Sequence, residues 1–205
     1  RQHTRVLGHY VDWETNDLNV RLSWRAASNL RLVTRYDFQG TTVRVQEAGL
    51  PFDEASERKS HIVAQTATWN PLPRWYLQGS VNVVFETMRT PAAKRTGNAA
   101  NLVSNSDANY TNFSLNSGYA LDEKSDLYVD YSYYNAENYI DTSARSLAYG
   151  THVTTQQASV TLTRRLDPRT IVTLKYAYAD NDDATQGGFA DYTAHMFYGK
   201  LQYRF

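Results

Sequence analysis

Apolar and polar residues alternate at every second position along most of this chain, and this alternation constrains its fold more than any other feature. In "NVRLSWRA" (19–26) the residues Val20, Leu22 and Trp24 are apolar, and the residues between them are polar. A period of two places successive side chains on opposite faces of a β-strand. Long helical patterns are absent, and no run approaches the roughly 18 apolar residues of a membrane-spanning helix. The sequence therefore predicts an all-β protein whose strands have one apolar and one polar face.

The predicted strands form pairs that are joined by tight turns. The turns are short segments rich in Asn, Asp, Pro or Ser, which favour β-hairpins. They lie at 27–29, 70–73, 122–124 and 167–169. Longer connections, rich in Asn, Asp, Gly, Ala and Thr, separate the pairs and predict surface loops. They cover 45–59, 89–108, 137–150 and 181–190. With "RVLGHYVDW" at the front and "YTAHMFYGKLQYRF" at the end, the pattern predicts about ten strands in a single domain, residues 1–205.

The composition of the two faces indicates what each of them contacts. The polar face is rich in Ser, Thr, Asn, Gln and small residues with some Arg, whereas a face exposed to bulk solvent favours Lys, Glu and Thr. On the apolar face aliphatic residues occupy the middle of the strands, and aromatic residues such as Trp24, Trp69 and Tyr133 lie near their ends. This distribution matches the aromatic girdles that flank a lipid-facing band. A closed antiparallel barrel also satisfies every backbone group in lipid, so we expect a transmembrane β-barrel with a polar interior.

A soluble β-sandwich or a lipocalin-like barrel, with the apolar face inward, is the alternative. It explains the alternation equally well. It does not explain the regular change between short and long connections, the terminal Phe205, or the 16 tyrosines against 7 phenylalanines. Tyrosine suits a boundary between apolar and wet surroundings, which favours the membrane barrel.

The chain ends in "YGKLQYRF", with an apolar or aromatic residue at every second place before the last one. This ending, together with the short turns and long loops, resembles Gram-negative outer-membrane β-barrels, whose last strand carries a signal for the barrel-assembly machinery. The resemblance implies a bacterial outer-membrane location among lipid and lipopolysaccharide, with tight turns on the periplasmic side and long loops outside the cell. It also implies an assembly signal formed by Phe197, Leu201, Tyr203 and Phe205.

A second, narrower resemblance concerns the central hairpin. The stretch "NYTNFSLNSGYALDEKSDLYVDYSYYNAENY" looks like the hairpins of large barrels of the porin–cytochrome type, which sheathe a periplasmic multihaem cytochrome. Those barrels are much longer than this chain. The chain starts with "RQHTRVLGHY" and no Met, so either a signal was removed or the chain is the C-terminal portion of a larger barrel. We favour the second, because Arg would be unusual as the first residue after signal cleavage.

Basic residues with the parity of the polar face form the most suggestive candidate site. They are Arg21, Arg25, Arg31, Arg35, Arg165, Lys175, Lys200 and Arg204. The acids of the same parity are fewer, mainly Asp37 and Asp130. Charged rings that line a pore set its selectivity, so a basic lumen wall would favour anions. Alternatively, the arginines fill a narrow barrel with hydrogen-bonded networks.

The first functional expectation is a porin-like channel for small solutes, with a basic wall that favours anions. The alternative is a structural sheath or anchor for a periplasmic or multihaem-cytochrome partner. An outer-membrane enzyme ranks below both, because His152 and His195 have the parity of the lipid-facing side, and that of His61 is ambiguous. We therefore expect no catalytic residues, no metal and no cofactor. The chain contains no cysteine, and its formal net charge of zero gives no argument for nucleic acid as a partner.

Overall fold

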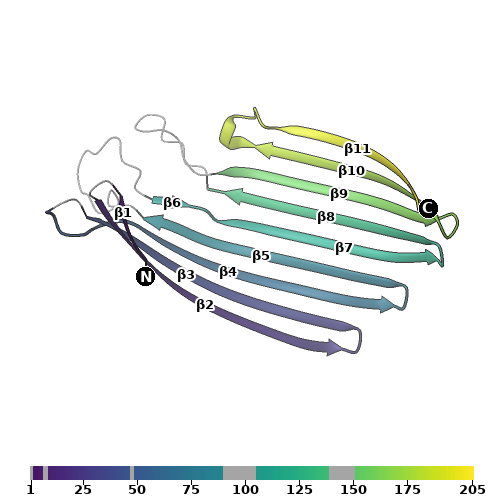
Figure 1. Ribbon diagram of the computed structural model, residues 1–205, viewed down its shortest axis with the longest axis horizontal. Coiled ribbons are helices and arrows are strands. Elements are labelled where there is room, and N and C mark those ends of the chain that lie inside the picture. The colour runs from purple at the N-terminus through teal and green to yellow at the C-terminus, as the bar shows by residue number, and fades with distance from the viewer. Residues whose placement is uncertain (1, 7–8, 47–48, 90–104, 139–150) are drawn as a thin grey trace.

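The protein forms one antiparallel β-sheet. The computed structural model describes residues 2–6, 9–46, 49–89, 105–138 and 151–205. Ten of their eleven strands lie side by side in chain order, and the short β6 pairs with the end of β5; nine of the strands are long (Figure 1). The strands are β1 (Gln2–Val6), β2 (His9–Ala27), β3 (Leu30–Gln46), β4 (Asp53–Leu72), β5 (Trp75–Arg89), β6 (Asn105–Asp107), β7 (Tyr110–Asp122), β8 (Ser125–Glu137), β9 (His152–Arg165), β10 (Thr170–Asp183) and β11 (Tyr192–Tyr203). A short 3-10 helix, η2 (Ala184–Gln186), follows β10. The described residues contain no helix that is long and apolar enough to span a membrane.

The predicted tight turns are confirmed and lie together at one end of the sheet, on the right of Figure 1. Side chains close two of these turns. Asp122 Oδ1 accepts a hydrogen bond from the backbone N–H of Lys124 at 2.7 Å. Asp167 Oδ1 accepts from the backbone N–H groups of Arg169 at 2.8 Å and Thr170 at 3.0 Å. Short polar side chains of this kind stabilise turns through local hydrogen bonds, so the positions of the turns were predictable from the sequence.

The strands are longer than the alternation predicted. The front strand and the one after it form a single 19-residue strand, β2, so there are nine long strands where the pattern suggested ten. Much of the predicted loop 45–59 is also strand, because β4 begins at Asp53. Strand pairing continues here although both faces are polar, supported by an ion pair between Arg58 and Glu86 at 2.5 Å. The predicted loops 89–108 and 137–150 fall largely outside the described residues.

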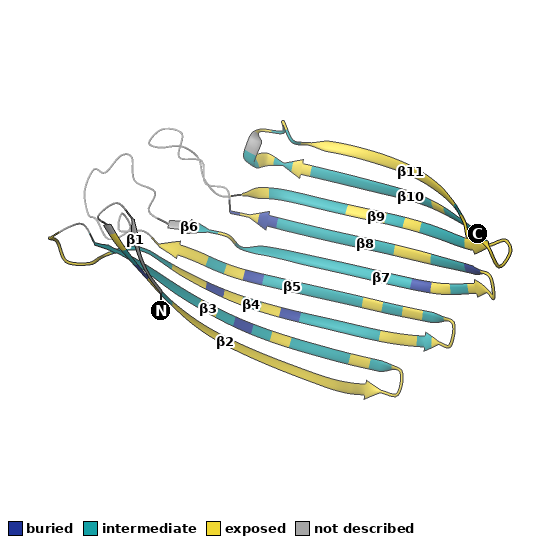
Figure 2. Cartoon of the chain, in the orientation of Figure 1, coloured by how far each residue is buried: buried dark blue, intermediate teal, exposed yellow. Residues whose placement is uncertain are grey.

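The strand register gathers the apolar residues on one face, as predicted. For example, Leu18 lies opposite Phe38, and Trp24 lies opposite Leu32. No described residue forms a second layer over this face, so large side chains such as Leu22, at 62%, are strongly exposed (Figure 2). Among the described residues only Ala64, Val84 and Ala136 are buried and apolar. This arrangement contradicts the soluble alternative, which needs the apolar face in a core.

The apolar face forms a band of limited depth. On β5 it extends from Leu77 to Phe85, about nine residues, close to the roughly 9–11 residues of a transmembrane strand. Aromatic residues lie at its boundaries, as with Trp69 and Trp75 beside the tight turns. The Trp75 indole donates a hydrogen bond to Ser117 Oγ at 2.9 Å, which satisfies a polar group on this face. The band therefore has the dimensions and the girdle of a lipid-facing surface.

The sheet has two edges in the described part of the chain. One edge is β2, which pairs with β1 only from His9 to Trp13, and the other is β11. No pairing between described residues joins β2 to β11. The sheet is thus a continuous wall with one apolar face and one polar face.

Candidate functional site

The polar face of the sheet carries the candidate site. Cross-strand pairing arranges its side chains in rows that run across neighbouring strands. Arg21, Arg35, Ala64 and Asn82 form one row across β2 to β5. Ser23, Val33, Thr66 and Ser80 form the next row toward the tight turns. These rows contain no hydrophobic side chain larger than valine, so the face is open to polar ligands.

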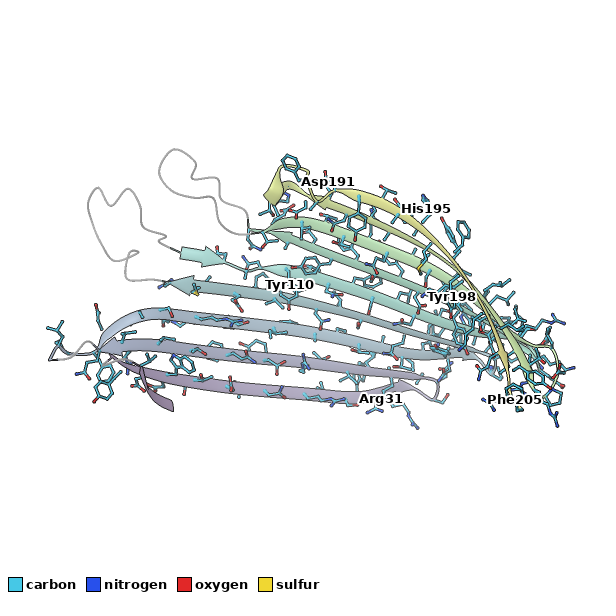
Figure 3. All side chains as sticks on the ribbon, turned by 45° about the horizontal axis from the view of Figure 1, so that its top comes forward. Arg31, Tyr110, Asp191, His195, Tyr198 and Phe205 are labelled. Atoms are coloured by element: carbon cyan, nitrogen blue, oxygen red, sulfur yellow. The ribbon has the colours of Figure 1, made fainter. Side chains whose placement is uncertain are left out.

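Four arginines on β2 and β3 form a compact group, which we call the arginine patch. Arg21 lies directly opposite Arg35, and Arg25 directly opposite Arg31. All four side chains are exposed, and Arg31 lies close to the tight-turn end (Figure 3). Like charges directly opposite one another destabilise a strand pair. The patch therefore carries a cost to the fold, which a bound anion would relieve.

Acidic residues neutralise only part of this charge. Arg35 Nε lies 2.7 Å from Asp37 Oδ2, and Asp37 also accepts a hydrogen bond from Asn19. Arg31 Nε donates to Ser23 Oγ at 3.2 Å. Arg21 and Arg25 form no ion pair with any described residue. The patch thus keeps an excess of positive charge, and both interpretations of these arginines stay predictions.

A hollow of about 260 Å³ lies beside the patch. Its lining residues are Arg21, Val33, Arg35, Ala64, Thr66, Ser80 and Asn82. Ala64 is the smallest of them and leaves space between Arg35 on one side and Asn82 on the other. The side chains of Thr66 and Asn82 have no hydrogen-bond partner among the described residues. Two guanidinium groups and two neutral hydrogen-bond donors therefore border the same small space.

The remaining basic residues lie elsewhere on the same face. Arg165 on β9, Lys175 on β10 and Lys200 on β11 have the predicted parity, and Arg204 follows the last strand residue. Four strands separate this group from the arginine patch, about 24 Å across the sheet at about 4.8 Å per strand. The predicted basic wall is therefore divided into two groups in this sheet.

Lys175 borders a hollow of about 510 Å³. Asp130 lines the same hollow and accepts a hydrogen bond from Ser159 Oγ at 3.2 Å. The other lining groups include Ser114, Asn116 and Gln157. Here the acid and the base balance each other, so this part of the face is polar without excess charge.

A third hollow, of about 620 Å³, lies at the tight-turn end and was not predicted from the sequence. Tyr76 and Tyr128 line it from either side of Gly118, which lies opposite both residues. The Tyr76 ring covers Gly118, so a Cβ atom at this position would clash with the ring. The stretch "RWYLQG" contains one local signal, an aromatic residue with the parity of the polar face, but the contact of this residue with Gly118 is not readable from it.

The histidines of ambiguous or outward parity lie on the apolar face. His61 Nδ1 is 2.8 Å from the hydroxyl of Tyr36, and His195 Nδ1 is 2.9 Å from that of Tyr176. His61 lies opposite Phe38, and their ring centroids are 5.0 Å apart. These histidines therefore belong to the girdle of the apolar face and not to the polar face.

The residues of the predicted assembly signal share the apolar face of β11. Phe197 is 81% exposed, and Leu201 and Tyr203 are exposed as well. The rings of Tyr203 and Phe205 meet edge to face with centroids 5.3 Å apart. Phe205 lies at the tight-turn end of the sheet (Figure 3), held near β10 because the Arg204 N–H donates to the Arg169 carbonyl at 2.9 Å. Their role in assembly stays a prediction.

Two solved structures are similar to this fold. OmpT, an outer membrane protein of Vibrio cholerae, aligns with 98% of this chain at 11% sequence identity and a TM-score of 0.47. The copper transporter OprC aligns with 87% of this chain, also at 11% identity, with a TM-score of 0.46. The chain spans 62% of the OmpT chain and 38% of the OprC chain, and at this identity the likeness extends to the fold alone. No family model matches the chain, and no curated protein is similar to it in sequence.

Proposed function

We propose that this sheet is part of the wall of a β-barrel in a bacterial outer membrane, and that the wall lines a porin-like channel for small solutes with a preference for anions. The observation that carries this proposal is the contrast between the two faces. One face exposes a girdled apolar band, and the other is polar and carries the arginine patch (21, 25, 31 and 35), for which Asp37 is the only ion-pair partner among the described residues. Rings of cationic side chains at a pore wall select for anions.

The orientation is part of the proposal. The tight turns face the periplasm, and the long connections face the cell exterior beside lipopolysaccharide. The exposed aromatic end of β11, from Phe197 to Phe205, presents the insertion signal to the barrel-assembly machinery. The polar face carries no proposed catalysis, because His61 and His195 lie on the apolar face, away from any lumen solute.

A planar-bilayer recording tests the channel. The purified protein should conduct, and a potassium chloride gradient should give a reversal potential that favours chloride. Arg21→Glu with Arg25→Glu reverses two charges that have no ion-pair partner among the described residues, so the reversal potential should shift toward cations. Lys124→Glu with Arg169→Glu, in exposed turns outside the wall, is the charge-matched control. Equal reversal potentials for the double variant and the control would refute the basic-wall mechanism.

A second function, a sheath or anchor for a periplasmic partner such as a multihaem cytochrome, is favoured by one observation. The 620 Å³ hollow with Tyr76 and Tyr128 lies at the end proposed to face the periplasm, and aromatic side chains are enriched at protein interfaces. A sheath should copurify with a haem protein that absorbs near the Soret region. Tyr76→Ala should release that partner, whereas Tyr133→Ala, on the apolar face and outside the hollow, should not. A colourless preparation that conducts ions would contradict the sheath.

A further inference from the structure

We propose that the hollow over Ala64 is a binding site for a small oxyanion, with inorganic phosphate as its simplest ligand. The inference rests on the proposed function, because it takes the polar face as the wall of a passage, and it names the solute class and the residues that hold it. The site consists of Arg21 and Arg35 on one side of Ala64 and of Thr66 and Asn82 on the other. Asn82 lies directly beyond Ala64 on β5, and Thr66 lies two residues further along β4 toward the tight turns. The site is separate from the Arg25–Arg31 pair, which does not line the hollow.

The first argument is electrostatic. Arg21 and Arg35 face each other across β2 and β3, and no acid pairs with Arg21 among the described residues. Bringing two guanidinium groups together costs free energy unless an anion lies between them. Guanidinium groups bind phosphate and carboxylate with two parallel hydrogen bonds, which makes arginine suited to tetrahedral oxyanions. Two such groups at one hollow favour an oxyanion over chloride. A chloride ion is a single acceptor atom, so it cannot accept two parallel hydrogen bonds from one guanidinium group.

The second argument is the composition of the far wall. Thr66 supplies a hydroxyl and Asn82 an amide, and neither donates to another described residue. Ser80 lies in the same wall, but its hydroxyl is engaged with Ser114 at 2.7 Å. An oxyanion held by the arginines would thus also meet neutral donors from β4 and β5. Half-buried polar groups without partners, aimed at one space, are typical of a ligand site.

The third argument is size. The hollow has about 260 Å³, just below the roughly 300–1,000 Å³ of pockets that enclose drug-sized ligands. It therefore fits a small anion with some of its water, or the charged end of a larger solute. The space exists because residue 64 is alanine, since its neighbours in the row are arginine and asparagine. Filling that position would remove the site without changing any charge.

Phosphate titration of the detergent-purified protein, followed by calorimetry, tests this site independently of conduction. The wild type should bind inorganic phosphate, and Ala64→Leu should weaken binding by about tenfold or more through the loss of charge-assisted hydrogen bonds. Ala177→Leu, which fills the hollow beside Lys175 on the same face, is the matched control and should bind as the wild type does. Arg21→Gln should weaken binding more than Arg25→Gln, although both remove one charge. Asp37→Asn, which frees Arg35 from its acid, should strengthen binding several-fold.

The outcomes separate the site from the channel. Phosphate binding that is absent in the wild type, or equal in Ala64→Leu and Ala177→Leu, would overturn the oxyanion site even if the bilayer recording shows anion preference. Phosphate binding that depends on Ala64 and Arg21, in a protein that does not conduct, would support the site and refute the channel. A tenfold excess of acetate or sulfate in the titration shows whether carboxylates or only tetrahedral oxyanions compete.

Discussion

At some positions on the polar face, a contact with a neighbouring strand limits which residue fits, and the local sequence does not predict that contact. Gly118 is the clearest example, since it lies opposite both Tyr76 and Tyr128 and the Tyr76 ring occupies the place of a side chain. An aromatic ring over a glycine excludes water from the strand pair and fixes the ring. Any larger residue at 118 must displace that ring.

Gly118→Ala should destabilise the protein by about 1–3 kcal/mol, the usual cost of an extra methyl group where there is no room. The measurement is the free energy of unfolding in urea. The folded fraction at each urea concentration is read from electrophoresis of unheated samples, in which folded and unfolded protein migrate differently. Gly79→Ala is the control, because a Cβ atom there meets its nearest neighbour only at 3.9 Å. Tyr76→Ala should make Gly118→Ala nearly neutral. Equal costs at 79 and 118 would show that the ring does not pack on the glycine.

Among the elements, the tight turns are stabilised by hydrogen bonds between residues that are close in the chain. The carboxylate of Asp167 accepts hydrogen bonds from the Thr170 side chain and from the backbone of Arg169, which holds the pKa of this carboxyl below its usual value. The backbone N–H of Lys124 likewise lowers the pKa of Asp122. Both turns thus use an ionised acid as a cap.

The stabilising effect of Asp167 should depend on pH. Because its pKa is lower in the folded turn than in the unfolded chain, the contribution is complete above the usual value of about 3.9 and is lost as the pH falls through the folded pKa. The measurement is the hydrogen-exchange protection of the Thr170 amide between pH 2 and pH 6. Protection should fall with acid in the wild type and stay level in Asp167→Asn, which keeps an acceptor but does not titrate.

Glu123→Gln is the matched control for this titration, since Glu123 lies in the neighbouring turn and makes no hydrogen bond with a described residue. It should leave the acid-dependent loss at Thr170 unchanged. An identical pH profile for the wild type and Asp167→Asn would mean that the carboxylate does not hold the turn.

At the scale of the whole molecule, the sheet edges decide what surrounds the polar face. Each long strand is antiparallel to the next, so β2 and β11 run in the same direction. In lipid an unpaired edge leaves backbone groups without partners, at several kcal/mol each. Antiparallel closure of this wall therefore needs an odd number of further strands, and the first of them should continue the register of β1, in which Gln2 lies opposite Trp13.

The backbone amides of β2 from Glu14 to Ala27 should therefore be protected from hydrogen exchange in the membrane-embedded protein to the same extent as those of β4, an interior strand. The backbone amides on the outer edge of β11 should be protected to the same extent. Mass spectrometry of peptides from both strands provides the measurement, with the turn at 167–169 as an unprotected reference. Rapid exchange along half of the β2 amides would show an open edge and would contradict closure.

The class of the fold and the positions of most strands, tight turns and the apolar face were predictable from the amino-acid sequence. Alternation and turn chemistry are local, so "NVRLSWRA" and the Asp167 turn identified strands, hairpins and the apolar face without any tertiary information. The strands extended further than predicted because backbone pairing does not stop where the alternation fades, as β4 shows from Asp53 onward. The parity of all four residues of the arginine patch was also readable.

The contacts between these residues became visible in the tertiary structure, because they depend on the register between strands. Register places Arg21 opposite Arg35, sets Ala64 between Arg35 and Asn82, and brings Tyr76 over Gly118. It also separates the arginine patch from the basic residues of β9 to β11 by four strands. These are contacts between residues far apart in the chain, and a period of two gives the face of a side chain but not its neighbour on the next strand. The hollow over Ala64 exists only through that registration.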